Sequence, residues 1–166
     1  YFNLMRTILK VCALFIATTI CTTVAFAAEK RYVDASTLTI INKAHNDGLP
    51  FNRVDISKYD IPEFAKKGLA NSTGLAIIFS TDSRNISAKW TTVVKRASTN
   101  MTPIFKSGCD LYIKEGNKWV FAGVARPKIG DNKHQFNIVS NMEEGVKECM
   151  LYLPMFDTVT SFEIGV

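Results

Sequence analysis

The chain has 166 residues, of which 47% are hydrophobic and 21% are charged, and its net charge is +5 at neutral pH. This length and balance suit one globular domain with a sizeable core, and they exclude a disordered polymer. Two of the positive charges, Arg6 and Lys10, lie near the N-terminus. The densest basic pairs, Lys66-Lys67 and Lys95-Arg96, fit a solvated face better than a track for nucleic-acid phosphates. We therefore expect no nucleic-acid partner.

The first 27 residues have the features of a secretory signal peptide. Residues 5–10 supply a positive start, and a mostly apolar run over 11–24 follows. Small residues beyond that run predict cleavage before Ala28. The run is too short and too rich in threonine to favour a stable membrane span. We expect a secreted or periplasmic protein without membrane contact after cleavage, and Cys21 leaves a lipid-anchored form open.

Residues 28–166 are predicted to form one β domain. Residues 1–4 precede the expected initiator Met5, and the chain stops inside an apolar, strand-like segment at 161–166. These two features indicate a fragment of a longer gene that lacks a C-terminal part.

Alternating apolar and polar residues, separated by turn chemistry, predict about nine short strands and one short helix. Strands at this spacing, without the strand–helix alternation of a parallel sheet, indicate an all-β fold: an antiparallel β-sandwich of jelly-roll type. The expected helix is 63–70, and the expected strands are 37–41, 51–55, 75–79, 86–90, 109–114, 118–122, 134–140, 148–153 and 160–166.

A hairpin is the most definite local prediction. Gly116-Asn117 suits a two-residue type II′ turn, because glycine takes positive φ at the first central position without steric cost. The flanking Glu115 and Lys118 should then face each other across the ladder. In the second strand Trp119 and Phe121 fall on one face.

The strand at 86–90 places Trp90 on one face with aliphatic neighbours, while Ser87 and Lys89 should face water. Core packing is the preferred interpretation of Trp90 and Trp119. The alternative is that tryptophan or tyrosine rings stack on a sugar. For Tyr112, on the face opposite Leu111, exposure or a second contact surface is expected.

Catalytic chemistry is poorly supported by the residues themselves. A serine hydrolase needs a histidine base and an orienting acid, and His45 and His134 lie in no recognisable motif. Two distant histidines without a Cys-x-x-Cys pattern also argue against zinc, and no cofactor motif is present. Cys109 and Cys149 leave a disulfide or two buried thiols open. We predict no catalytic, metal or cofactor site in this chain.

Several segments resemble one family in the expected order. Gly108–Tyr112 matches the Gly-x-Asp-Leu-Tyr signature of the domain that precedes secreted SGNH/GDSL-type esterases, chiefly bacterial. The resemblance covers about 33–166, with phenylalanine at 51 where tyrosine is usual and Phe156-Asp157 where Tyr-Asn is usual. The other matching pieces are Phe51–Asp55, Phe79–Ser83, Ile86–Trp90, Tyr152–Phe156 and Glu163–Val166.

This resemblance implies a jelly-roll domain followed by an α/β catalytic domain beginning just past Val166, so no catalytic residue can be assigned here. The parent would remove acyl groups from an exported polysaccharide or oligosaccharide. Partners would be the C-terminal SGNH domain and an acylated glycan. Asp110, Tyr112, Arg53 and Trp90 are candidates for an interdomain or ligand contact, although a paired structural role is the default for Arg53 and Asp110. A self-sufficient carbohydrate-binding module or a purely structural docking domain are the alternatives.

Overall fold

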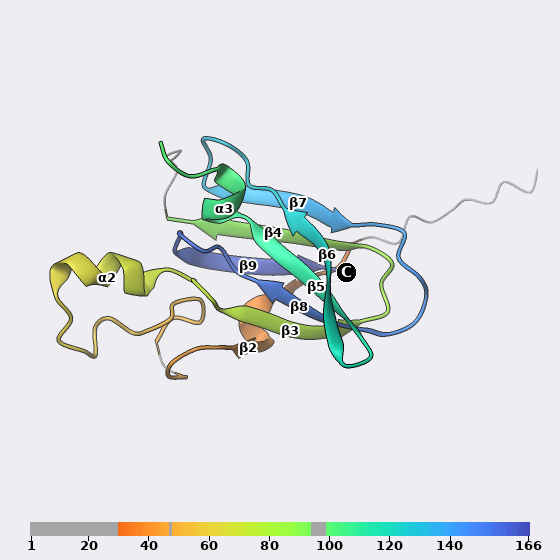
Figure 1. Ribbon diagram of the computed structural model, residues 1–166, viewed down its shortest axis with the longest axis horizontal. Helices are drawn as coiled ribbons and strands as arrows, with labels where there is room; N and C mark the ends of the chain where they lie inside the picture. The colour runs from red at the N-terminus through yellow and green to blue at the C-terminus, as the bar shows by residue number, and fades with distance from the viewer. Residues whose placement is uncertain (1–29, 47, 94–98) are drawn as a thin grey trace, which may run out of the picture.

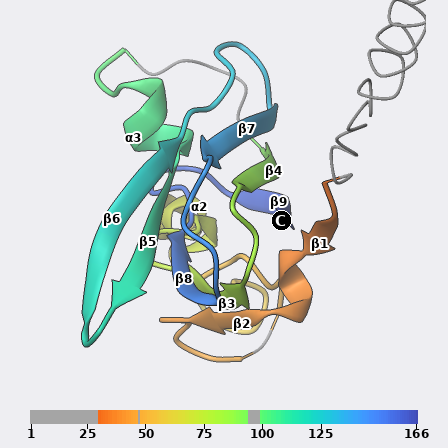
Figure 2. The same ribbon diagram turned by 90° about the vertical axis from the view of Figure 1, so that its right-hand side faces the viewer.

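A computed structural model describes residues 30–46, 48–93 and 99–166 of the chain. In this part of the chain nine strands form two antiparallel sheets that pack face to face (Figures 1 and 2). Sheet A has the order β1-β9-β4-β7, formed by Tyr32–Asp34, Val159–Gly165, Ile86–Thr92 and Lys133–Val139. Sheet B has the order β2-β3-β8-β5-β6, formed by Thr39–Ile41, Ala76–Thr81, Lys147–Tyr152, Cys109–Glu115 and Lys118–Ala125.

The strand order is that of a jelly roll. When the short edge strand β2 is set aside, β1, β9, β4 and β7 face β3, β8, β5 and β6. Apart from the β2–β3 and β5–β6 pairs, consecutive strands belong to opposite sheets, as in paired Greek keys. The predicted antiparallel β-sandwich of jelly-roll type is confirmed. The expected signal peptide lies outside the described residues.

The helices are only partly as expected. Helix α2 covers Glu63–Ala70 as predicted, buries none of its residues and lies apart from both sheets (Figure 1). The expectation of a single helix was wrong, because a 3-10 turn at Ala35–Thr37 and helix α3 at Pro103–Ser107 also form. Helix α3 begins with proline after Thr102, whose Oγ1 accepts the N–H of Phe105 at 3.3 Å. No helix among the described residues is long and apolar enough to cross a lipid bilayer.

One predicted strand does not form, and one strand was not predicted. Phe51–Asp55 forms no strand. Instead, Phe51 is 3% exposed and its ring lies 6.4 Å from that of Phe162, so its apolar character reflects core packing from a loop. Strand β1, which was not predicted from the sequence, pairs with β9.

The β5–β6 hairpin forms as predicted. Glu115 pairs with Lys118, and Gly116 has φ of +58°. Trp119, however, is 36% exposed, so the prediction that it packs in the core was wrong. Its strand is the edge of sheet B and is apolar on both faces, and alternation alone did not reveal which face turns inward.

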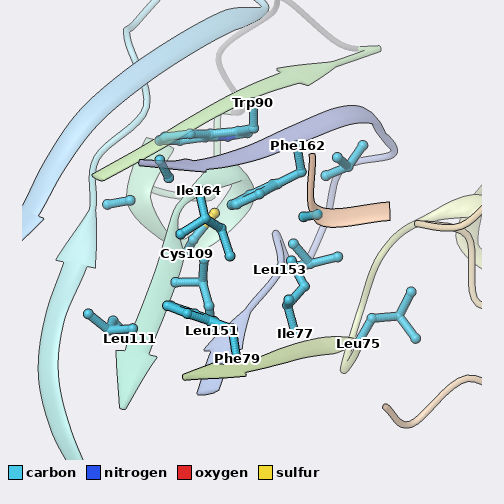
Figure 3. Close-up of a cluster of buried hydrophobic side chains, with 14 of the residues drawn as sticks. Leu75, Ile77, Phe79, Trp90, Cys109, Leu111, Leu151, Leu153, Phe162 and Ile164 are labelled. Atoms are coloured by element: carbon cyan, nitrogen blue, oxygen red, sulfur yellow. The ribbon is translucent and has the colours of Figure 1, made fainter. Parts of the chain in front are cut away.

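The core lies between the two sheets. Figure 3 shows Trp90, Phe162 and Ile164 of sheet A pointing toward Leu111 and Leu151 of sheet B, with Cys109 between the layers. Most of these side chains are at most 2% exposed. Burial of this kind is the main favourable term in folding.

The position of Ser87, on strand β4 of sheet A, also differs from the sequence prediction. It was expected to face water but is 1% exposed, at the point where the register of β4 against β7 shifts between Ile86 and Ser87. Its Oγ donates to Oδ1 of Asn137 at 3.0 Å, which satisfies the buried hydroxyl.

Leu151→Ala should lower the free energy of unfolding by about 2–5 kcal/mol, because it leaves a cavity at a fully buried position. Leu49→Ala is the matched control. Leu49 is 66% exposed, so the same truncation should change stability by no more than about 0.5 kcal/mol. Urea unfolding followed by tryptophan fluorescence measures both. Equal losses in the two variants would contradict the assignment of Leu151 to the core.

Candidate functional site

A hollow of about 430 Å³ opens where the outer face of sheet B meets helix α3. The family-signature residues of β5 contribute to it, together with the end of β8 and the loop that follows. We call this hollow the β5–α3 pocket, and its main lining residues are Phe105, Gly108, Asp110, Tyr112, Tyr152 and Met155.

Strand register explains why these side chains meet. Asp110 lies directly opposite Tyr152 on the neighbouring strand β8, and directly opposed side chains share one face of a sheet. Tyr112, two residues further along β5, projects from the same face. The rings of Tyr112 and Tyr152 are 5.8 Å apart with an interplanar angle of 80°. The pocket therefore has two nearly perpendicular aromatic walls beside one carboxylate.

Gly108 sets the join between α3 and β5. Its N–H donates to the carbonyl of Ile104 at 2.8 Å, and its φ is −77°. A Cβ at this position would lie 2.3 Å from the Ile104 oxygen and 3.0 Å from the Ala125 oxygen. The glycine is thus required by close backbone approach rather than by positive φ. It holds Phe105 of α3 at the end of the pocket.

Asp110 lacks an electrostatic partner within the described part of the chain. No described group donates a hydrogen bond to its carboxylate or forms an ion pair with it. Partial burial raises the pKa of this carboxyl above its usual value. Lys114 projects from the same face of β5, beyond Tyr112. Its ammonium is already paired with the Glu148 carboxylate at 2.9 Å. The pocket therefore contains a partly desolvated carboxylate without a counter-charge.

The surface around the pocket is apolar. Phe105, Met155 and Phe156 are 49%, 43% and 42% exposed, and the two phenylalanine rings lie 5.3 Å apart. Further along the outer face of sheet B, Phe121 is 56% exposed and packs its ring 5.7 Å from that of Tyr112. These side chains give the rim of the pocket an exposed aromatic and apolar character.

The outer face of sheet A is different in character. It carries a hollow of about 570 Å³ that is lined mainly by polar side chains. Lys89 and Glu163 are cross-strand neighbours there, and the Lys89 ammonium lies 3.6 Å from the Tyr32 ring centroid. The two outer faces of the sandwich therefore suit different surroundings.

The four predicted contact residues do not all meet. Asp110 and Tyr112 share the pocket. Arg53 does not line it: its Nη2 donates to the carbonyl of Gly68 at 2.9 Å, near the end of α2, and its Nε has no hydrogen-bond partner among the described residues. Trp90 is 2% exposed and donates Nε1–H to the Ser107 carbonyl at 3.0 Å, so it packs in the core as preferred.

Tyr152 and Phe105 line the pocket but were not predicted as site residues. Tyr152 lies in the matching segment Tyr152–Phe156, but its place beside Asp110 depends on the β5–β8 register. Phe105 belongs to the unpredicted helix α3, for which the signal was Thr102-Pro103.

His134 and the two described cysteines are buried within the fold. His134 is 5% exposed, and burial lowers its pKa. Its Nδ1 accepts the Lys128 N–H at 3.1 Å, so in the neutral ring Nε2–H donates to Oγ1 of Thr92 at 3.3 Å. Cys109 and Cys149 are buried free thiols, and burial raises the pKa of Cys149 to about 11. Among the described residues, no group of three or more His, Cys, Asp or Glu could hold a metal ion.

Fold and pocket together define a jelly-roll domain with a Gly-x-Asp-Leu-Tyr motif on its outer sheet face. The chain belongs to the GxDLY family, described as the N-terminus of SGNH-hydrolase-type esterases, whose family model matches residues 30–166. The family predicted from the sequence is therefore confirmed. None of the curated proteins matches this chain.

Two solved structures are similar. A protein from Bacteroides ovatus assigned as a GDSL-like lipase is 43% identical with a TM-score of 0.79, over 82% of this chain and 40% of that one. A salicylyl-acyltransferase from a tetracycline biosynthetic pathway is 17% identical with a TM-score of 0.59, over 84% and 40%. At 17% identity the likeness shows the fold alone. The chain spans less than half the length of both proteins.

Gly108→Ala should destabilise the domain by about 1–3 kcal/mol or more, since the new methyl group meets two backbone oxygens that cannot move independently. Gly68→Ala is the control, because nothing lies within 4 Å of the position that its new methyl group would take in helix α2. That variant should gain up to about 1 kcal/mol from helix propensity. Chemical denaturation distinguishes the two. A fully stable Gly108→Ala protein would show that the close approach is not a constraint.

Asp110→Asn should be at least as stable as the wild type at pH 7. The folded pKa of Asp110 is raised, so the folded state binds more protons than the unfolded state at pH values just above 3.8. Ionisation at neutral pH therefore opposes folding. The difference between the two proteins should shrink as the pH falls through the raised pKa toward 3.8.

Asp131→Asn is the control with the opposite sign. Backbone hydrogen bonds from Lys133 and Asn132, with Lys128, lower the pKa of Asp131 to about 2. Its stabilising effect is present above 3.8 and is lost as the pH falls toward 2. Titration of the carboxyl carbons by NMR measures both groups directly, and an Asp110 pKa at or below 3.8 would contradict the prediction.

Proposed function

We propose that this chain is the non-catalytic N-terminal accessory domain of a secreted SGNH/GDSL-type serine esterase. Its parent removes acyl groups, chiefly acetyl, from polysaccharide or oligosaccharide. The family supports the esterase context, and the 40% coverage of the GDSL-like relative supports a longer parent chain. Secretion rests on the signal-peptide features of residues 1–27.

One observation carries the accessory role: the signature residues Asp110 and Tyr112 line an open pocket within an apolar surface, rather than a catalytic constellation. No histidine lines this pocket, and among the described residues no nucleophile is hydrogen-bonded to its carboxylate, Asp110. The exposed aromatic residues and methionine around the pocket are compatible with a contact between protein surfaces, where these residue types are enriched. The partner is the C-terminal SGNH catalytic domain of the same polypeptide.

A self-sufficient carbohydrate-binding module is the second candidate. Trp119 favours it, because this ring is 36% exposed at the edge of sheet B, and flat aromatic faces stack on sugars. Titration of the chain with acetylated xylan and mannan fragments should leave tryptophan fluorescence unchanged if the accessory role is correct. A saturable change that Trp119→Leu abolishes would favour the binding module.

The full-length protein should hydrolyse p-nitrophenyl acetate and release acetate from acetylated xylan, whereas the 166-residue chain should do neither. The physical reason is that the nucleophile and its base are expected in the following domain. Measurement of nitrophenolate and of free acetate tests both parts separately. Clear turnover by the 166-residue chain would overturn the accessory role, and a full-length protein inactive on every ester would overturn the esterase assignment.

A further inference from the structure

The geometry of the β5–α3 pocket is specific enough to indicate the chemistry of its occupant. Tyr112 and Tyr152 form two walls at 80°, and Phe105 lines the pocket from α3. Asp110 lies beside Tyr152 across the β5–β8 ladder. Aromatic rings with a nearby carboxylate are an arrangement by which proteins hold organic cations, because a ring face and a carboxylate both attract positive charge.

We propose that the β5–α3 pocket is an aromatic–carboxylate cage for an organic cation, and that its occupant is an arginine or lysine side chain of the catalytic domain that follows in the same polypeptide. The identity of the occupant rests on the proposed function. The cage itself rests on the described residues.

The charge of the site supports a cation over a neutral group. Asp110 is the carboxylate of the pocket, and burial alone accounts for the shift in its pKa, with no nearby positive charge among the described residues contributing. Lys114, which extends from the same strand face, is held by Glu148 through contacts of 3.1 and 2.9 Å. A bound guanidinium or ammonium would supply the missing counter-charge.

The surroundings of the pocket favour a protein side chain over a small free cation. The apolar surface continues beyond the pocket onto Phe156 and Phe121, which are 42% and 56% exposed, and a small ligand would leave both uncovered. The chain spans only 40% of its GDSL-like relative, so most of such a protein lies in another domain. Among cationic side chains, the arginine guanidinium also stacks on aromatic rings and binds a carboxylate through two parallel hydrogen bonds.

The first test uses the 166-residue chain and a free probe. N-acetyl-arginine methylamide should shift the NMR signals of the Tyr112 and Tyr152 rings in the millimolar range, while the neutral N-acetyl-norleucine methylamide should not. Asp110→Asn should weaken binding about tenfold through loss of the charge-assisted contact. Glu163→Gln, on the outer face of sheet A, is the matched control and should bind as the wild type does. Failure of the arginine probe to bind, or equal binding of the neutral probe, would overturn the cage.

The second test uses the full-length protein and identifies the source of the cation. If a side chain of the catalytic domain fills the cage, the arginine probe should not bind the full-length wild type. Asp110→Asn and Tyr152→Leu should each separate the thermal unfolding of the two domains and speed proteolysis between them. Glu163→Gln should do neither. Equal probe binding by the full-length protein and the 166-residue chain would overturn the assignment to the catalytic domain.

These outcomes are separable from failure of the proposed function. A full-length esterase whose Asp110→Asn variant keeps wild-type domain coupling would overturn the assignment of the occupant to the catalytic domain and leave the function intact. The opposite result is also possible: the full-length protein hydrolyses no ester, yet the 166-residue chain binds the arginine probe. That result would overturn the proposed function but not the cation chemistry of the pocket.

Discussion

The close approach of Gly108 to two carbonyl oxygens is the constraint on which both the core and the pocket depend. The absence of a side chain lets α3 end directly against the start of β5. Ser107, one residue earlier, then presents its carbonyl to Nε1 of the buried Trp90 and its hydroxyl to the fully buried Asp157 at 2.7 Å. Asp110, two residues later, faces outward into the pocket. The close backbone approach at Gly108 thus positions both the buried hydrogen bonds of Ser107 and the outward side chain of Asp110.

The two outer faces show how a single sandwich can serve two environments. Near the pocket, the outer face of sheet B carries aromatic and apolar pairs such as Tyr112–Phe121 and Tyr112–Met150, although Lys114 and Glu148 form an ion pair further along it. The outer face of sheet A carries polar pairs such as Lys89–Glu163. Because water covers charged surface at little cost while exposed apolar surface favours burial, sheet B is the face that gains most from a protein partner.

Local alternation was sufficient to predict most of the fold but not the pairing that builds the pocket. The β5–β6 hairpin, for example, follows from a glycine turn and alternating residues. The contact of Asp110 with Tyr152 depends on a ladder between residues 42 positions apart, which no short-range pattern encodes. Phe51 shows the converse error, since a loop residue buried in the core has the same local composition as a strand.

Side chains of the Gly-x-Asp-Leu-Tyr motif alternate between the two faces of strand β5, so the motif has an inward and an outward half. Cys109 and Leu111 point into the core, at 1% and 0% exposure, whereas Asp110 and Tyr112 alternate with them and point outward. The inward residues are explained completely by packing within this domain. The outward carboxylate is not, because partial burial raises its pKa and the described residues supply it with no counter-charge. Packing within the described residues therefore accounts for the inward half of the motif, and the outward half is what motivates the proposed contact with a second domain.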